Sequence, residues 1–220
     1  GRPEVLKVLQ SQDMLPAITF IFSRAGCDGA LYQCLRSRMV LTSQEEAQEI
    51  KDIVDAGVEG IPEEDLQVLD FKRWREALSR GFAAHHAGML PAFRHIVEDL
   101  FVRGLVRAVF ATETLALGIN MPARTVVLEK LIKFNGEAHV DLTAGQYTQL
   151  TGRAGRRGID TLGNAVVQWA PAMDPRQVAG LASTRTYPLI STFAPGYNMA
   201  INLLGMLGFE DSLRLLEKSF

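Results

Sequence analysis

Residues 106–122, VRAVFATETLALGINMP, decide the fold class because they join an apolar run directly to a loop of small and hydroxyl-bearing residues. The first six residues include β-branched and aromatic side chains, which predicts a buried strand over 106–111. The loop after it can offer backbone N–H and side-chain O–H groups to phosphate oxygens. For residues 112–122 taken alone, an ordinary strand-to-helix turn is the alternative interpretation.

Further buried strands and amphipathic helices alternate on both sides of this stretch. Strands are predicted at residues 17–22, 82–84, 125–129 and 165–169. Helices are predicted at about residues 28–37, 43–56, 70–80, 91–103 and 144–150. Such alternation is typical of an open, mostly parallel α/β sheet flanked by helices. Ligands bind these sheets beyond the carboxyl ends of the strands, so we expect chemistry in the strand-end loops.

The pattern divides the chain into three parts. We expect a linker, or the end of an earlier element, over residues 1–14, an α/β domain over 15–172, and a helical connector over 173–220. In the connector, helices are predicted at about 174–182, 197–205 and 211–218, with no strand. The chain begins with Gly rather than Met, and we expect it to be an excised piece of a longer protein.

Composition excludes several classes of protein and conceals an uneven charge. Of 220 residues, 47% are hydrophobic and 22% charged, as in folded rather than disordered proteins. No apolar run approaches the roughly 18 residues that a membrane span needs, and no signal peptide is recognisable. The net charge is −2 because residues 41–70, with ten acidic side chains and one lysine, carry −9 and the rest carries +7. The balance therefore does not argue against nucleic acid as a partner.

Two features of the composition have a structural interpretation. The acidic segment belongs to a helical insertion at about residues 38–80, which is either a solvated helical face or an arm that docks a partner. Cys27 and Cys34 are too few for a disulfide framework. We expect both cysteines to be reduced, in an intracellular, cytoplasmic protein.

The most unusual stretch is residues 149–158, QLTGRAGRRG. Arg153 and Arg156 are three residues apart, so one helical turn would place both guanidinium groups on the same face. A guanidinium binds phosphate oxygens bidentately, and arginines offered to a phosphoryl group stabilise its transfer. A solvated basic loop or a localisation signal is the alternative for this stretch alone.

Two further strand ends carry polar residues. The stretch 85–91, HHAGMLP, leads into a helix whose amino terminus can bind an anion. Metal binding by His85 and His86 is not expected, because adjacent side chains diverge and no third ligand has zinc spacing. Ser23 and Arg24 follow the first strand, where a structural arginine is the alternative.

In this order and at these spacings, the four stretches resemble motifs IV, IVa, V and VI of superfamily-2 helicases, most closely the Ski-like DExH helicases of actinobacteria. The residues that carry the resemblance are 20–24, 84–91, 111–122 and 149–160, within roughly 15–170. Residues 192–199 and 216–220 resemble the connector into that family's winged-helix domain. Ala194 and Gly196 depart from the basic residue and the serine expected there.

The resemblance implies a motor with two RecA-like domains that bind ATP and Mg²⁺ in the cleft between them. This sequence contains neither the P-loop pattern nor a DExH box, both of which belong to the first domain. We therefore expect the second RecA-like domain, inactive alone, with ATP and Mg²⁺ held mainly by the first. The alternative is a non-catalytic nucleic-acid-binding module with the same fold.

The resemblance also implies a role for each site residue. Arg153 and Arg156 would act as arginine fingers, and Gln149 would position the attacking water or the phosphate. Gly118 and Asn120 would approach the nucleotide and couple it to the nucleic-acid strand. The residues expected to hold the strand are Ser23, Arg24, His86, Ala87, Gly88, Thr112, Glu113 and Thr114. Expected partners are single-stranded RNA or DNA, travelled 3′ to 5′, the first RecA-like domain, and the winged-helix and ratchet domains; no metal site of its own and no membrane are expected.

Overall fold

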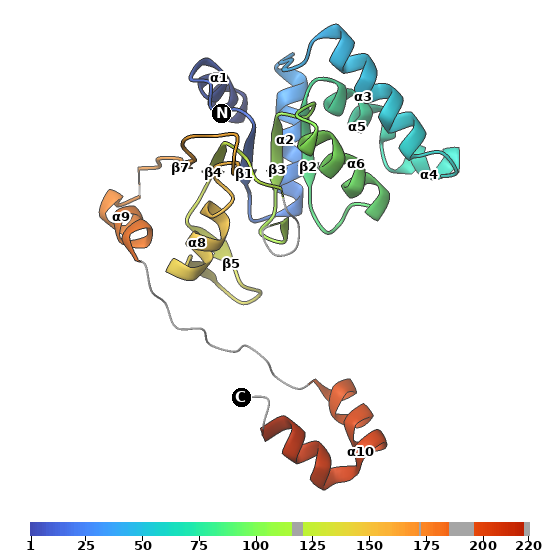
Figure 1. Cartoon of the computed structure of the whole chain (residues 1–220), viewed down its shortest axis with the longest axis vertical. Coiled ribbons are helices and arrows are strands. Elements are labelled where there is room, and N and C mark those ends of the chain that lie inside the picture. Colours follow the sequence, from blue (N-terminus) through green and yellow to red (C-terminus); the bar gives the residue numbers. More distant parts are fainter. Residues whose placement is uncertain (116–120, 172, 185–195, 218–220) are drawn as a thin grey trace. The chain divides into compact units, whose positions relative to one another are not determined.

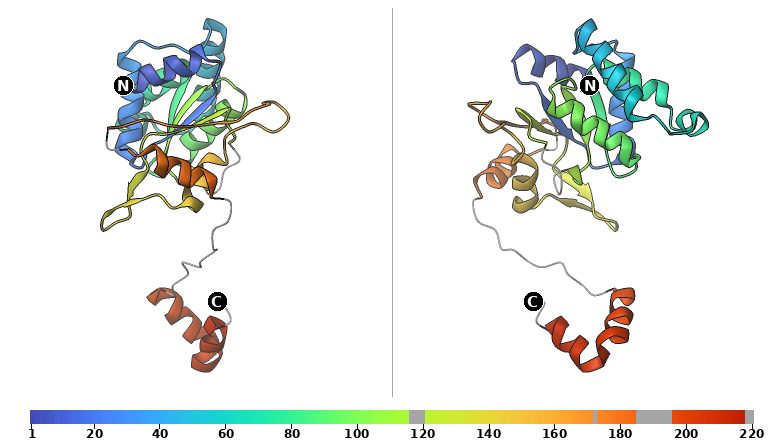
Figure 2. Two further views of the ribbon diagram at one scale, coloured as in Figure 1. Left: turned by 90° about the vertical axis from the view of Figure 1, so that its left-hand side faces the viewer. Right: turned by 45° about the vertical axis from the view of Figure 1, so that its right-hand side comes forward.

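The computed structural model describes residues 1–115, 121–171, 173–184 and 196–217. The chain divides into two compact units, residues 1–184 and 185–220, and each is described by itself. The first unit contains a parallel sheet with helices on both faces (Figure 1 and Figure 2).

The sheet of the first unit is parallel throughout. Its strands are β1 Ala17–Phe20, β2 Phe82–His85, β3 Ala108–Ala111, β4 Thr125–Leu128 and β7 Asn164–Val167. Among the described residues these five strands follow the order β2-β3-β1-β4-β7. Ala17 of β1 pairs with Ala108 of β3 on one side and with Thr125 of β4 on the other. The predicted open α/β sheet is confirmed, and it is consistent with a RecA-like domain.

Helices cover both faces of this sheet. Among the described residues of the first unit they are α1 Arg2–Ser11, α2 Arg24–Arg36, α3 Gln44–Gly57, α4 Glu63–Val68, α5 Phe71–Ser79, α6 Pro91–Val102, α8 Ala144–Thr151 and α9 Pro175–Ser183. One core lies between the sheet and α3, α5, α6 and α8, and a second lies between the sheet and α1 and α2. Alternation along β3 sends Val109 and Ala111 into the first core and Ala108 and Phe110 into the second. All four residues of β3 are therefore buried.

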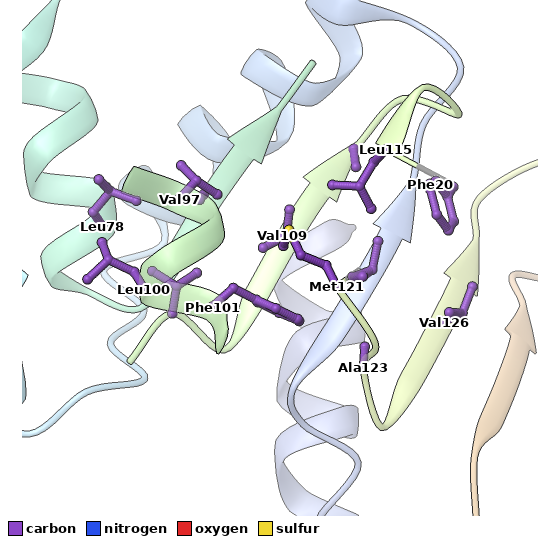
Figure 3. Close-up of a cluster of buried hydrophobic side chains, with 14 of the residues drawn as sticks. Phe20, Leu78, Val97, Leu100, Phe101, Val109, Leu115, Met121, Ala123 and Val126 are labelled. Atoms are coloured by element: carbon purple, nitrogen blue, oxygen red, sulfur yellow. The ribbon is translucent and has the colours of Figure 1, made fainter. Parts of the chain in front are cut away.

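The first core uses the apolar helix face that the sequence predicts for residues 91–103. Figure 3 shows Val97, Leu100 and Phe101 of α6 between Leu78 of α5 and Val109 of β3. Burying an aliphatic or aromatic side chain of this size stabilises a fold by about 1.5–3 kcal/mol. This face therefore holds α6, and the loop in front of it, firmly against the sheet.

Local signals set where several helices begin. Ser23 Oγ accepts a hydrogen bond from Gly26 N at 3.0 Å, so α2 begins at Arg24, four residues before the predicted start. At α3, Ser43 Oγ accepts from Glu46 N at 3.1 Å and the Glu46 carboxylate accepts from Ser43 N at 2.8 Å, a capping box. The insertion also contains α4, between the two helices predicted there.

Residues 2–11 form a helix, α1, where the sequence suggested a linker or the end of an earlier element. Leu6 and Leu9 are buried in the second core. Arg2 Nε lies 2.6 Å from Glu129 Oε1, just past the carboxyl end of β4. After α1, Asp13 Oδ2 lies 2.7 Å from Arg124 Nη1, just before the first residue of β4. Ion pairs at both ends of β4 therefore tie this amino-terminal segment to the sheet.

A small hairpin follows β4 that the sequence analysis did not predict. β5, Ile132–Phe134, pairs antiparallel with β6, His139–Asp141. Between them, Asn135 Oδ1 accepts hydrogen bonds from Glu137 N and Ala138 N, both at 2.9 Å. The first and last residues of each strand are exposed, so no apolar run marks either strand.

In the second unit, α10 spans Tyr197–Glu217 and is interrupted at Gly208, where φ is 74° and ψ is 176°. The interruption agrees with the two helices predicted for residues 197–205 and 211–218. In the part of the chain that the structure describes, no helix is both long enough and apolar enough to cross a membrane.

Both cysteines of the chain lie on α2 and are buried, free thiols. Burial raises the pKa of Cys27 and of Cys34 to about 12. Neither residue therefore offers a thiolate near neutral pH, so both act as small core side chains.

Candidate nucleotide and nucleic-acid sites

Arg156 belongs to a cluster of ion pairs centred on the carboxylate of Asp160. Its Nε donates to Asp160 Oδ2 and its Nη2 donates to Asp160 Oδ1, both at 2.8 Å. Arg124 donates from Nε to Asp160 Oδ1 at 2.9 Å. Hydrogen bonds from the Arg156 guanidinium, opposed by burial and reinforced by Arg124, hold the pKa of Asp160 well below its usual range. The cluster is therefore fully ionised at neutral pH.

The loop that carries Arg156 has a backbone shape that requires glycine. Ala123 N donates to Arg153 O at 2.9 Å, and Gly155 N donates to Ala123 O at 2.7 Å, which ties the loop to the residues before β4. Gly155 has a φ of +90°, and a Cβ there would lie 3.2 Å from Gly163 Cα. The glycines thus allow the close backbone approach that the sequence suggested.

The arginine loop lies at the amino-terminal edge of the sheet rather than at the carboxyl edge. Arg156 lines a cavity of about 320 Å³ together with Pro16, which precedes β1, and Arg107, which precedes β3. The helix α8 ends at Thr151, so Arg153 and Arg156 follow it in a loop. The single helical turn expected to carry both arginines is therefore wrong, because the chain leaves the helix to pair with Ala123.

Gln149 lies in the last turn of α8, and Glu113, from the loop after β3, lines the same cavity. This cavity of about 210 Å³ is also lined by Lys133 and Gln146. Glu113 Oε2 accepts from Lys133 Nζ at 2.7 Å. The structure thus brings Gln149, a predicted nucleotide residue, next to Glu113, a predicted strand residue.

The loop after β1 and the loop after β2 meet at the carboxyl edge of the sheet. Ser23 caps α2, and Arg24 is the first residue of that helix. A Cβ built on Gly88 would lie 3.2 Å from Arg24 Cδ and 3.1 Å from His86 Nδ1. Ala87 beside it is exposed. These residues come from separate motifs, and the structure places them in one small area.

The two adjacent histidines have different partners on different helices. His85 Nε2 lies 2.8 Å from Glu98 Oε1 on α6, whereas His86 Nε2 lies 3.0 Å from Asp28 Oδ1 on α2. Gly88 N donates to His86 Nδ1 at 3.2 Å, so the proton of neutral His86 sits on Nε2 and points at the carboxylate. His86 therefore holds the 86–88 loop. Within the described residues, no three His, Cys, Asp or Glu side chains gather as metal ligands would.

The loop after β3 places its hydroxyl groups near these residues. Thr112 Oγ1 lies 2.9 Å from Thr114 Oγ1, and Thr112 N donates to His85 O at 3.3 Å. The second contact joins this loop to the end of β2. Gly118 and Asn120, which the sequence assigns to the nucleotide, lie outside the described residues.

Sequence reasoning missed several residues around these sites. A cavity of about 530 Å³ beside Ser23 is also lined by Lys130, Lys133 and Phe134, from the segment between β4 and β6. Asp160 and Arg124 were not assigned a role either. Lysines directly after a buried strand, and an aspartate four residues after Arg156, are the signals that could have found them.

Comparison with known proteins identifies the class of domain. Residues 59–158 match the helicase conserved C-terminal domain. The whole chain is 65% identical over 220 residues to the "Probable helicase HelY" of Mycobacterium tuberculosis and covers 24% of that protein. It is 34% identical over 217 residues to the human "Exosome RNA helicase MTR4", where 99% of the chain covers 20% of the protein.

The chain therefore contains a helicase C-terminal domain of the HelY- and MTR4-like DExH helicases, as the four motifs predict. A second mycobacterial relative, the "Probable helicase HelY" of Mycobacterium leprae, is 63% identical over 223 residues. The chain spans about a quarter of the length of these HelY relatives, 24% in each case. A plant relative is named as ATP-dependent: the "DExH-box ATP-dependent RNA helicase DExH10" of Arabidopsis thaliana is 35% identical over 201 residues, which are 91% of the chain and 20% of that protein.

Proposed function

We propose that this chain is the second RecA-like motor domain of a helicase that moves 3′ to 5′ along single-stranded RNA or DNA. One observation carries the proposal: charged and polar groups suited to phosphates occur at both edges of one sheet. Arg156 lies at the amino-terminal edge, and Ser23, Arg24 and Thr112 lie at the carboxyl edge. A sheet that binds nucleotide on one side and strand on the other can couple the two.

Under this proposal, Arg153 and Arg156 act as arginine fingers, Gln149 positions the attacking water or the phosphate, and Gly118 and Asn120 approach the nucleotide. The described side chains fit an anion, because Arg156 is 23% exposed and its Nη1 has no hydrogen-bond partner among the described residues. The P-loop, the DExH carboxylate and the Mg²⁺ ligands come from a first RecA-like domain. ATP, when bound, supplies the phosphoryl group that is transferred to water.

The strand site comprises the residues of the three carboxyl-edge loops. They are Ser23, Arg24, His86, Ala87, Gly88, Thr112, Glu113 and Thr114. The Arg24 side chain, which would lie 3.2 Å from a Cβ built on Gly88, and the hydrogen bond from Thr112 N to His85 O support one continuous surface. Hydroxyl and backbone groups of this kind hold sugar–phosphate oxygens and position a strand without reading its sequence.

The division of the chain follows the same proposal. Residues 15–172 form the motor domain, and residues 173–220 form a connector into a winged-helix region, with a ratchet domain beyond it. Residues 1–14 lead in from the first motor domain. Under this proposal the complete helicase acts in the cytoplasm and does not bind a membrane.

The test compares nucleotide turnover and strand binding in the complete helicase polypeptide. We expect Arg156→Ala to lower kcat about 10³-fold or more, as loss of an arginine finger does, with strand affinity preserved. Equal loss of both properties would assign Arg156 to the strand or to folding. Unchanged kcat would favour a non-catalytic nucleic-acid-binding module. Matched RNA and DNA overhangs in the same unwinding assay identify the substrate.

A second measurement uses the chain itself. We expect the purified chain to show no Mg²⁺-dependent ATPase activity, because phosphoryl transfer needs a P-loop lysine and magnesium ligands that its sequence lacks. Measurable turnover above a buffer blank, retained after a second purification step, would contradict the proposed division of labour between two domains.

A further inference from the structure

Both oxygens of the buried Asp160 carboxylate accept hydrogen bonds from neighbouring arginines. Its side chain is 1% exposed. Oδ2 accepts from the Arg156 backbone N–H at 2.9 Å and from Arg156 Nε at 2.8 Å. Oδ1 accepts from Arg156 Nη2 at 2.8 Å and from Arg124 Nε at 2.9 Å. Three of these four bonds come from one residue, so Asp160 restrains both the backbone and the side chain of Arg156.

The pairing occupies one edge of the Arg156 guanidinium and leaves the other edge available. A guanidinium carries five N–H donors in a planar fork. Nε and one hydrogen of Nη2 point at Asp160, whereas Nη1 has no hydrogen-bond partner among the described residues. The group is 23% exposed and lines the cavity of about 320 Å³ at the amino-terminal edge. An anchored inner edge with an open outer edge suits a guanidinium that must meet an oxyanion in a fixed orientation.

Arg124 fixes the carboxylate in turn. It donates from Nε to Asp160 and from Nη1 to Asp13 Oδ2 at 2.7 Å, so it lies between two carboxylates. Because Arg124 directly precedes β4, its backbone is held by the sheet. The cluster therefore connects Arg156 to the central sheet of the first unit.

We propose that Asp160 is a positioning residue that holds the Arg156 guanidinium with its Nη1 edge turned toward the transferred phosphoryl group. This inference rests on the proposed function, since it concerns the orientation of the arginine finger. Asp160 itself is buried and touches no substrate. Its contribution is to remove the rotamer freedom that a solvated arginine would have to lose during each turnover.

The first test is Asp160→Asn in the complete helicase polypeptide, which removes the charge at nearly constant volume. We expect kcat of the strand-stimulated ATPase to fall about 10²-fold, the loss that a misplacement of about 1 Å can cause, with KM for ATP and strand affinity changed by less than about threefold. The matched control is Asp55→Asn, which breaks the exposed bidentate pair of Asp55 with Arg75 in the insertion. The control should leave kcat unchanged; an unchanged kcat in Asp160→Asn as well would overturn the inference.

A double-mutant cycle separates positioning from a general structural effect. In an Arg156→Ala background, Asp160→Asn should lower kcat by less than about twofold further, because its target has been removed. A further loss of about 10²-fold would show that Asp160 acts without Arg156 and would overturn the inference. Failure of the proposed function gives a different result, since Arg156→Ala alone would then leave kcat unchanged.

A second variant covers the case in which Asp160→Asn does not fold. Asp160→Glu keeps the charge and lengthens the side chain by one methylene, so it displaces the guanidinium while both arginines keep a carboxylate partner. We expect a thermal midpoint close to that of the wild type, with kcat reduced at least about tenfold. A wild-type kcat in a folded Asp160→Glu protein would overturn the inference.

Discussion

Acidification from pH 7.5 to 5.5 should destabilise the chain through one buried imidazole, that of His85. The residue is 2% exposed, its Nε2 lies 2.8 Å from Glu98 Oε1, and its Nδ1 has no hydrogen-bond partner among the described residues. Protonation of the ring would add an N–H at Nδ1, where no acceptor lies within hydrogen-bond distance among the described residues. Burial therefore lowers the pKa of His85, with the neighbouring Glu98 carboxylate acting in the opposite direction.

The sign of the effect follows from proton binding in the two states. In the unfolded chain a histidine has a pKa of about 6.5, whereas folded His85 binds its proton only at lower pH. Between these two pKa values the unfolded state holds more protons, so the free energy of unfolding falls as the pH falls. One such group changes that energy by at most about 1.4 kcal/mol per pH unit, and the change stops once folded His85 is protonated as well.

Urea denaturation at pH 7.5, 6.5 and 5.5 measures this contribution by comparison of wild type with His85→Gln. The amide of glutamine can still donate to Glu98 but does not titrate, so the variant should lose less stability on acidification than the wild type. His139→Gln, on the exposed β5–β6 hairpin, is the matched control and should retain the wild-type dependence. Parallel pH curves for wild type and His85→Gln would refute the reasoning, and so would a wild-type chain that gains stability toward pH 5.5.

Three further predictions concern the core, the arginine loop and the strand site. Phe110→Ala should reduce the free energy of unfolding by about 3–5 kcal/mol, because Phe110 is 1% exposed in a central strand, and urea titration would detect a smaller loss. Gly155→Ala should destabilise the chain by about 1–3 kcal/mol, since φ is +90° and the added Cβ meets Gly163; a wild-type thermal midpoint would contradict this. In the complete polypeptide, Thr112→Val should weaken strand binding about tenfold by removing a hydroxyl donor to a charged phosphate, with the salt dependence of binding unchanged because no charge is lost; an unaltered affinity in fluorescence anisotropy would show that Thr112 meets no phosphate.

The buried strands could be predicted from sequence because the sheet hides both of their faces. Residues 108–111 and 126–128 are apolar runs bounded by polar residues, and they coincide with β3 and with most of β4. The strands β5 and β6 could not be predicted, since each has three residues and exposes the first and third. The helix α1 also depends on tertiary packing, since Leu6 and Leu9 are buried in the core that α1 forms with α2 and the sheet.

Part of the candidate site could also be predicted from the sequence, and part required the structure. The sequence singled out Arg156, because arginines in a glycine-rich loop suit phosphates, but it could not show which carboxylate holds that side chain. Arg124 and Asp160 lie 36 residues apart, and the pairing of Ala123 with Ala154 and of β4 with β7 brings them together. The contact between Gly88 and Arg24 likewise depends on β1 and β2 ending at one edge of the sheet. The sequence motifs therefore identified candidate site residues, and the tertiary structure showed which side chains hold them in place.

The parallel pairing of β1 has a consequence for the newly made chain. Residues 17–20 leave the ribosome before their neighbours β3 and β4, which begin roughly 90 or more residues later, and synthesis of that length takes roughly 5–20 s. During that interval a segment whose four residues are all buried in the folded sheet has no strand to pair with. Its exposed backbone can accept any other extended chain. This early strand is therefore open to mispairing until β3 and β4 have been made.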